Sequence, residues 1–457
     1  MTQRAVTREL AQYIVDLKCD DLSQATIQAA KGAVLDQCGI MLLGSTLPWT
    51  RPSYEVVREL GGRPESTIVR YGTKVSAPDA AFVNANFAHS CELDDTGYLR
   101  GGHPGSATVS SALALGERAH LSGRELLLAI TAGYEVMSRL GRIILPADNH
   151  FHTQTVLGPF ASAAVSGKLL GLNGEQMVHA LAIAGSHSSG THEYARSGGE
   201  VKRLHAAIAA RAGMMAALLA QRGLTGPPTI LEGLYGTCRI FGGVTDPQIM
   251  ETILESLGDN WYAVQGRIIK PFPTDGGMHT SFQAMEHMMQ EHQLQSDQVE
   301  EINVGINEQY VTHVGYIHEP TDTISAQFSM AFSLGLLLVK GKIDLRDYMN
   351  PGLWKDPRIM AVAKNVHVHS DPSMVGDAYY GVRMQVRLVD GRVIEVQELY
   401  RKGSPKNPFT REELDAKFRS LASAVLGEQE MEQVIETINR LEELGDISQV
   451  VSLLVKQ

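Results

Sequence analysis

The sequence has few cysteines and no long apolar run, and each absence excludes a class of protein. Four cysteines, at positions 19, 38, 91 and 238, are scattered through 457 residues without a C-x-x-C pair. This spacing excludes a disulfide framework and an iron–sulfur site and predicts a reducing compartment. Apolar runs such as residues 336–339 are far shorter than the roughly 18 residues of a membrane span. The N-terminus is polar rather than a signal peptide, so we predict a cytoplasmic protein.

Basic tracts and nucleotide-binding glycine motifs are also absent. Asp and Glu number 51 against 40 Lys and Arg, a net charge of −11, so nucleic acid is not an expected partner. Neither G-x-x-x-x-G-K-[ST] nor a strand-linked G-x-G-x-x-G occurs. The pairs His367/His369 and His279/His287 do not make a closed ligand set, so no metal site is predicted.

Helical patterns dominate the first 265 residues. Leu10, Tyr13, Ile14 and Leu17 form an apolar stripe of helical period. Capping boxes at residues 122–125 (Ser-Gly-Arg-Glu) and 173–176 (Asn-Gly-Glu-Gln) predict the starts of further helices. Segments 161–167 and 206–220 consist largely of small residues. Small side chains let helix axes approach closely, so we expect these two helices to be central and mutually buried.

The pattern changes near Gly266. Residues 300–306 and 366–369 alternate like strands, residues 380–396 read as a hairpin about Asp390-Gly391, and residues 325–339 read as a helix. A capping box at 410–413 (Thr-Arg-Glu-Glu) marks the return of helix. We therefore predict a mostly α protein, with a large all-helical domain from residues 1–265 plus 403–457 and an inserted, smaller α+β lid domain, 266–402.

The segment 92–105 holds the densest set of titratable groups. Glu92, Asp94 and Asp95 are followed by Thr96 and, seven residues later, by His103 in a glycine-rich loop that leads into a helix. Clustered carboxylates raise one another's pKa, and an imidazole titrates near neutrality without help. The segment is therefore a candidate active site, and a solvated acidic turn is the alternative.

Three further segments carry candidate groups at the starts of helices or at the change of architecture. His152 precedes a small-residue helix, and Lys202 with Arg203 opens the alanine-rich one. Two cations at a helix N-terminus oppose the helix dipole, which suggests a carboxylate ligand. Lys270 precedes Pro-Phe-Pro, a rigid extended segment. A capping histidine, a solvated basic turn and a structural linker are the respective alternatives.

Taken together, these segments resemble the MmgE/PrpD family, which includes 2-methylcitrate dehydratase, cis-aconitate decarboxylase and iminodisuccinate epimerase. The matching pieces occur in the family's order over about residues 30–410: ANFAHSCELDDT, HPGSATVSSALALGE, LLAITAGYEV, FHTQTVLGPFASAA, KRLHAAIAARAG, LTGPPTILEG, KPFP and FSMAFSLG. The resemblance implies a helical domain with an inserted α+β domain, an active site in the cleft between them, a homodimer, and no metal or organic cofactor.

The resemblance also implies roles for individual positions. His103, His152, Lys202 and Lys270 match active-site residues of the family, Thr96 matches a threonine, and Glu92 stands where the decarboxylase has an aspartate. We expect Glu92 and Asp95 to orient or tune the histidines. Thr96, Arg203, Asp275 and Tyr316 complete the predicted substrate-binding set, Tyr316 by a loose alignment with a family tyrosine.

Two departures from the decarboxylase bear on the reaction. The loop between Thr96 and His103 is one residue longer, and Asp275 stands where that enzyme has a histidine, with His279 four residues further on. A carboxylate in place of an imidazole disfavours a third anionic group of the substrate at that point. cis-Aconitate decarboxylation is therefore the less favoured activity.

Members of this family act on small polycarboxylates at a carbon beside a carboxylate. Such chemistry needs a positioned base and cations where negative charge develops. The predicted function is that of a cofactor-independent dehydratase, a lyase acting on a 2-methylcitrate-like hydroxy-polycarboxylate. The runner-up is an epimerase or isomerase of a C4 dicarboxylate (iminodisuccinate-like) that uses the same proton abstraction. A non-catalytic homologue is disfavoured because the two histidines and two lysines occur together.

Overall fold

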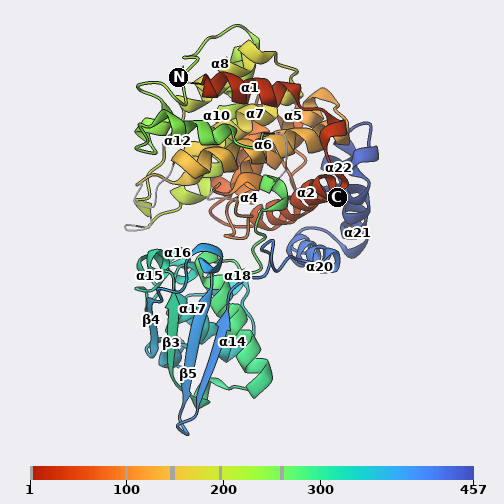
Figure 1. Ribbon diagram of the computed structural model, residues 1–457. Helices are drawn as coiled ribbons and strands as arrows, with labels where there is room; N and C mark the ends of the chain where they lie inside the picture. The colour runs from red at the N-terminus through yellow and green to blue at the C-terminus, as the bar shows by residue number, and fades with distance from the viewer. Residues whose placement is uncertain (1–3, 98–100, 145–149, 195–197, 258–261, 457) are drawn as a thin grey trace. The chain divides into compact units, whose positions relative to one another are not determined.

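Most elements of the chain are helices, which confirms the predicted mostly α fold class. The computed structural model describes residues 4–97, 101–144, 150–194, 198–257 and 262–456 (Figure 1). The chain divides into two units: Met1–Ile268 with Thr410–Gln457, and Ile269–Phe409. Both ends of the chain belong to the first unit.

The first unit is built from helices, with one two-stranded ribbon. The helices from the N-terminal part of the chain are α1 (Val6–Asp16), α2 (Gln24–Gly44), α3 (Arg51–Leu60), α4 (Ala77–Ala88), α5 (Pro104–Ala119), α6 (Gly123–Ile144), α7 (Thr153–Leu169), α8 (Gly174–Gly185), α10 (Val201–Gln221), α11 (Thr237–Ile240), α12 (Pro247–Glu251) and α13 (Tyr262–Gln265). The C-terminal part adds α20 (Arg411–Ala422), α21 (Glu428–Asn439) and α22 (Ser448–Leu453). The ribbon pairs β1 (Ser66–Thr67) with β2 (Lys74–Val75).

Helix α10 packs against α4, α7 and α8 in the interior of this unit. Its approach to α7 depends on small residues: a Cβ added at Gly213 would lie 2.4 Å from the carbonyl oxygen of Pro159. The expectation that the two small-residue helices are central and mutually buried is confirmed. Among the described residues, α10 is also the helix that is long and apolar enough to cross a membrane. Burial of its alanine side chains against these three neighbours accounts for that composition.

All three predicted capping boxes are formed. The Ser122 backbone N–H and hydroxyl both donate to Glu125 at the start of α6, and Asn173 accepts from the Gln176 backbone at the start of α8. At α20 the Thr410 side chain accepts from the Glu413 backbone. These caps satisfy backbone N–H groups that a helix leaves without partners at its N-terminus.

The second unit contains a four-stranded sheet of order β4-β3-β5-β6, with helices packed on it. Strand β3 is parallel to β4 and antiparallel to β5, and β5 and β6 form the hairpin predicted at Asp390-Gly391. The elements are α14 (His279–His292), β3 (Val299–Ile306), α15 (Glu308–Val314), α16 (Thr323–Gln327), α17 (Met330–Lys340), α18 (Leu345–Tyr348), α19 (Pro357–Ala363), β4 (Val366–Ser370), β5 (Val382–Leu388) and β6 (Val393–Glu398).

The core of this unit lies between the sheet and helices α14 and α17. Strand β5 alternates strictly, so that Met384, Val386 and Leu388 are buried on one face. The prediction of a single helix over 325–339 is wrong in one respect, because this segment forms two helices, α16 and α17. Phe328 is the C-cap of α16, and Ser329 begins α17 by accepting a hydrogen bond from the Phe332 backbone N–H at 3.0 Å.

Candidate active site

The acidic segment of the sequence joins two helices of the first unit, and a histidine stands at each end of it. His89 is the C-cap of α4, and His103 is the N-cap of α5. Glu92 has a φ of +56°, a left-handed conformation that is uncommon for a residue with a side chain. Thr96 is fixed to Ile268 by two backbone hydrogen bonds of 2.8 Å. The backbone is thus held at several points, which orients the side chains between them.

Asp94 is the carboxylate that contacts the histidines. Its Oδ2 lies 2.7 Å from His89 Nδ1 and 3.8 Å from His103 Nδ1. His103 Nδ1 also lies 2.9 Å from the backbone oxygen of Asp95. Carboxylate and carbonyl oxygens only accept hydrogen bonds, so Nδ1 carries the proton in both rings. In the neutral form of either ring, the lone pair is therefore on Nε2 and can accept a proton.

Asp95 has a different environment from the one we expected. Its side chain accepts hydrogen bonds from the Tyr134 hydroxyl and from the Gly105 backbone N–H, the latter at 3.0 Å, and lies 3.9 Å from Arg267. Burial raises the pKa of Asp95 to about 6, although the Tyr134 hydrogen bond and the Arg267 charge lower it. Asp95 contacts His103 through its backbone carbonyl, and Asp94 is a carboxylate that contacts two imidazoles.

His152 forms a pair with a histidine that the sequence did not single out. Its Nδ1 lies 2.7 Å from Nδ1 of His205, so one ring donates and the other accepts. Burial, followed by the charges of Lys202 and His89, lowers the pKa of His152 well below its usual value. Burial likewise lowers the pKa of His205 to about 3. Both rings are therefore neutral at pH 7.

The histidines form one cluster in the first unit. The ring centroid of His89 lies 5.2 Å from that of His103 and 5.7 Å from that of His152. The ring of His152 lies 5.4 Å from that of His192 and 4.9 Å from that of His205. The side chain of His103 is 16% exposed, whereas that of His89 is fully buried. The structure thus brings together five imidazoles, and His103 is a member that solvent can reach.

The two predicted cations of α10 point to different partners. Lys202 forms a buried ion pair with Glu92, and its charge contributes to the lowered pKa values of His152 and His205. Arg203 instead stacks on Trp49, with its guanidinium carbon 3.7 Å from the ring centroid, and pairs with Glu200. Lys202 is therefore the cation beside the histidine cluster.

The remaining predicted residues lie in the second unit. Lys270 is buried and donates to the carbonyl of Thr274 at 3.4 Å. Asp275 caps a short turn by accepting from Gly277 N–H at 2.8 Å, and it lies 3.4 Å from His313. Burial raises the pKa of Asp275, but His313, Lys270 and the Gly277 N–H outweigh burial and lower it, so this carboxylate is ionised.

The tyrosine beside this group is Tyr310. A Cβ added at Gly277 would lie 2.1 Å from the ring of Tyr310. Burial, together with the charges of neighbours that include Asp275, raises the pKa of Tyr310 well above its usual value. Tyr316, the residue selected by alignment, is 69% exposed.

Comparison with known proteins assigns most of the chain to one family. The MmgE/PrpD N-terminal domain matches residues 8–250, and the MmgE/PrpD C-terminal domain matches residues 272–443. The chain belongs to the MmgE/PrpD family.

Several relatives of this MmgE/PrpD chain are aligned over nearly their full length. The cis-aconitate decarboxylase-like protein oryM of Aspergillus oryzae is 28% identical, covering 98% of this chain and 97% of its own. A cis-aconitate decarboxylase of Aspergillus terreus is 27% identical over 98% and 96%, and that of Homo sapiens is 28% identical over 99% and 95%.

The sequence did not single out His89, His192 and His205, nor Asp94 in its contact with histidines. His89 and His205 lie inside or next to motifs that match the family, yet each is a single histidine on a helix. Only the folded structure shows that His89 approaches Asp94 and that His205 approaches His152.

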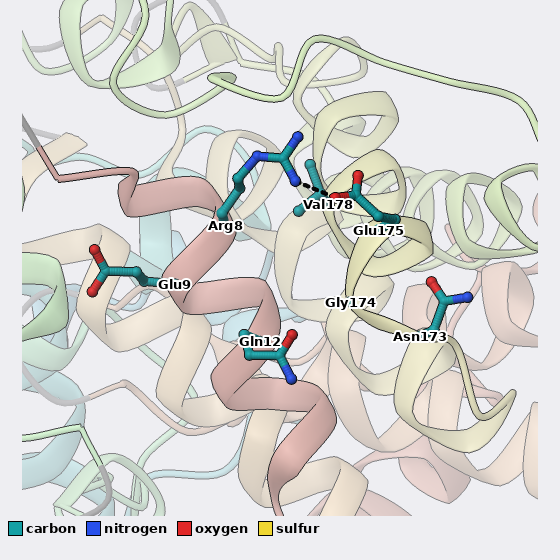
Figure 2. Close-up of a pocket in the computed structure, with 7 residues that line it drawn as sticks. All are labelled: Arg8, Glu9, Gln12, Asn173, Gly174, Glu175 and Val178. Carbon is teal, nitrogen blue, oxygen red and sulfur yellow. Dashed lines mark hydrogen bonds and ion pairs between the residues drawn. The ribbon is translucent and has the colours of Figure 1, made fainter.

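A surface groove elsewhere on the first unit has a different lining. A surface groove between α1 and α8, with a volume of about 600 Å³, lacks an imidazole (Figure 2). Its lining residues are Arg8, Glu9, Gln12, Asn173, Gly174, Glu175 and Val178, and Arg8 and Glu175 are paired with each other. Within the described ranges, no group of three or more His, Cys, Asp or Glu side chains is arranged to hold a metal ion.

Proposed function

We propose that this chain is a cofactor-independent lyase that dehydrates a small hydroxy-polycarboxylate by removing a proton α to a carboxylate. The observation that carries the proposal is the contact of two Nδ1 atoms of the histidine cluster with acceptor oxygens. Asp94 and the Asp95 carbonyl hold the Nδ1 protons of His89 and His103, which leaves both Nε2 atoms basic. A positioned imidazole in its basic form at neutral pH is what abstraction of a weakly acidic C–H proton requires.

His103 is assigned as the base because its side chain is partly exposed. Its Nε2 takes the α-proton, and Asp94, with Oδ2 3.8 Å from Nδ1, stabilises the imidazolium that forms. The electron pair of the C–H bond becomes the new C=C bond as the C–O bond breaks. The hydroxyl that departs and the proton removed from carbon together make the released water. A base of this kind typically contributes roughly 10²–10⁴-fold.

The His152–His205 pair and Lys202 serve the two places where negative charge develops. Because one ring of the pair donates through Nδ1, the other, as a neutral imidazole, carries its proton on Nε2 and can hydrogen-bond the departing oxygen. Lys202, buried beside these rings, stabilises the enolate-like dianion formed when the α-proton leaves. We also propose that the enzyme is a cytoplasmic homodimer.

Decarboxylation is the second candidate, and the similarity to cis-aconitate decarboxylases over nearly the whole chain favours it. In that reaction the same cation would stabilise the carbanion left by CO₂, and an imidazole would return a proton to carbon. Asp275, half-buried and ionised where the decarboxylase has a histidine, argues for a different substrate. Epimerisation uses the first proton transfer alone.

One experiment separates these reactions. The purified protein is incubated in D₂O with 2-methylcitrate, citrate, cis-aconitate and C4 dicarboxylates, and the products are followed by ultraviolet absorbance, CO₂ release and NMR. A dehydratase forms a conjugated alkene without CO₂, a decarboxylase releases CO₂, and an epimerase exchanges the α-proton without either product. No turnover and no exchange with any of these acids would refute the proposed function.

A further inference from the structure

Among the residues that the structure describes, Arg401 of the second unit is a buried arginine without a carboxylate partner. Its side chain belongs to the largest fully buried ones of the chain. One nitrogen, Nη1, donates to the carbonyl oxygen of Gly276 at 2.6 Å, and the guanidinium carbon lies 3.7 Å from the centroid of the Tyr380 ring. Neither partner carries a negative charge. An arginine buried in this way is costly unless an anion compensates it.

The other edge of the guanidinium is unsatisfied. Among the described residues, neither Nε nor Nη2 of Arg401 has a hydrogen-bond partner. The Nε–H and one Nη2–H of an arginine lie on the same edge and point in parallel directions. This edge matches the two oxygens of a carboxylate in a bidentate pair. The orphaned atoms are thus a matched pair of donors.

Two charged groups neighbour this position: the cation Lys270, which lowers the pKa of His279, and the carboxylate of Asp275, which raises it. Arg401 Nη1 and Lys270 Cε both lie within 4 Å of the point where a Cβ of Gly276 would stand. Burial, and after it the charges of Lys270 and Arg401, lowers the pKa of His279, so His279 stays neutral. His279 Nδ1 is a further buried atom without a partner in the described parts of the chain.

From these observations we infer that the Nε/Nη2 edge of Arg401 is a carboxylate-binding site. Within the proposed function, on which this assignment of the ligand rests, the ligand is a small polycarboxylate, and Arg401 binds one of its carboxylates through this edge. The alternative is that Arg401 only braces Gly276 and Tyr380.

Binding of tricarballylate (propane-1,2,3-tricarboxylate) tests the inference without turnover, because this acid has no hydroxyl to lose. Isothermal titration compares the wild type with Arg401→Gln, Arg401→Lys and Arg383→Gln. Arg383 is an exposed arginine of the same unit and is the matched control. We expect Arg401→Gln to weaken binding roughly tenfold to a hundredfold, since charge-assisted hydrogen bonds are lost. Arg401→Lys should also weaken it, because lysine lacks the two-donor edge, whereas Arg383→Gln should bind like the wild type.

The inference is overturned if both folded Arg401 variants bind as tightly as the wild type. It is also overturned if the wild type binds neither tricarballylate nor citrate nor succinate, or if equimolar inorganic phosphate displaces tricarballylate. If the variants do not fold, a crystal structure of the wild type with tricarballylate decides. A carboxylate within about 3.2 Å of Nε and Nη2 supports the site, and a carboxylate bound elsewhere refutes it. Arg401-dependent binding without dehydration of any hydroxy acid would refute the proposed function and leave the site standing.

Discussion

Replacing Asp94 by asparagine should remove most of the activity while keeping the fold. Asp94 Oδ2 lies 2.7 Å from His89 Nδ1, and asparagine has nearly the same size and an oxygen that can still accept this hydrogen bond. The substitution removes the negative charge that stabilises a protonated His103. It therefore separates electrostatic support of the base from packing.

The size of the effect follows from the distance between Asp94 and His103. At 3.8 Å, two unit charges interact by about 4 kcal/mol at an effective dielectric constant near 20. With the proton largely transferred in the transition state, the rate should fall by roughly 10²–10³. Exchange of a charged for a neutral hydrogen bond to His89 should lower the free energy of unfolding by only about 1–2 kcal/mol.

The assay is kcat for alkene formation, with urea unfolding measured on the same samples. Asp446→Asn is the matched control, since Asp446 Oδ2 also lies close to a histidine Nδ1, that of His120, at 2.9 Å but on the surface. The control should keep wild-type kcat. An Asp94→Asn enzyme whose kcat stays within about threefold of the wild type would refute the assignment of Asp94 and His103.

Three further predictions concern stability and the site. Burial lowers the pKa of His205 to about 3, so below about pH 6.5 the unfolded chain binds a proton that the folded chain does not bind, and stability falls as the pH drops. Between pH 7 and pH 5, His205→Asn should therefore lose about 2 kcal/mol less unfolding free energy than the wild type. An equal loss in both proteins would contradict this. Lys202→Met breaks a buried ion pair with Glu92 and should lower the free energy of unfolding by about 3–5 kcal/mol, and activity with it. The double variant Lys202→Met with Glu92→Gln should recover stability but not kcat. Recovery of kcat would exclude Lys202 from catalysis. Gly213→Ala places a Cβ 2.4 Å from the Pro159 oxygen and should lower the free energy of unfolding, measured in urea, by at least about 1–3 kcal/mol. At Gly445 an added Cβ meets no atom within 4 Å, so Gly445→Ala should change the free energy of unfolding by less than about 0.5 kcal/mol.

Local signals predicted much of the secondary structure because their partners are near in sequence. Ser122 and Glu125 are three residues apart, and each satisfies a backbone group of the other's turn. The Asp390-Gly391 hairpin likewise needs only a residue that tolerates positive φ, and Gly391 has a φ of +87°. The break between α16 and α17 escaped notice because apolar residues continue across it, although Ser329 is an ordinary N-cap residue.

Predicting the site required tertiary information. His103 and His152 could be selected from the sequence, because each stands at the start of a helix beside other polar residues. The sequence held no reason to prefer Asp94 over Asp95 as the partner of the histidines. That choice depends on the path of the backbone through Glu92, whose positive φ is not encoded by a glycine. Arg401 is distant in sequence from Lys270 and Gly276, so only the fold shows the orphaned edge of its guanidinium.

The assignment of His103 as the base is tested most directly by the transfer of a carbon-bound proton to solvent, measured by NMR in D₂O. The wild type and His103→Gln are each incubated with the best substrate of the acid panel, and deuterium at the α-carbon is measured alongside product. If His103 Nε2 is the base, the wild type should turn over its substrate, and the variant should lose both exchange and product by roughly 10²-fold or more while its fold is unchanged. Exchange in His103→Gln at the wild-type rate would show that another group removes the proton.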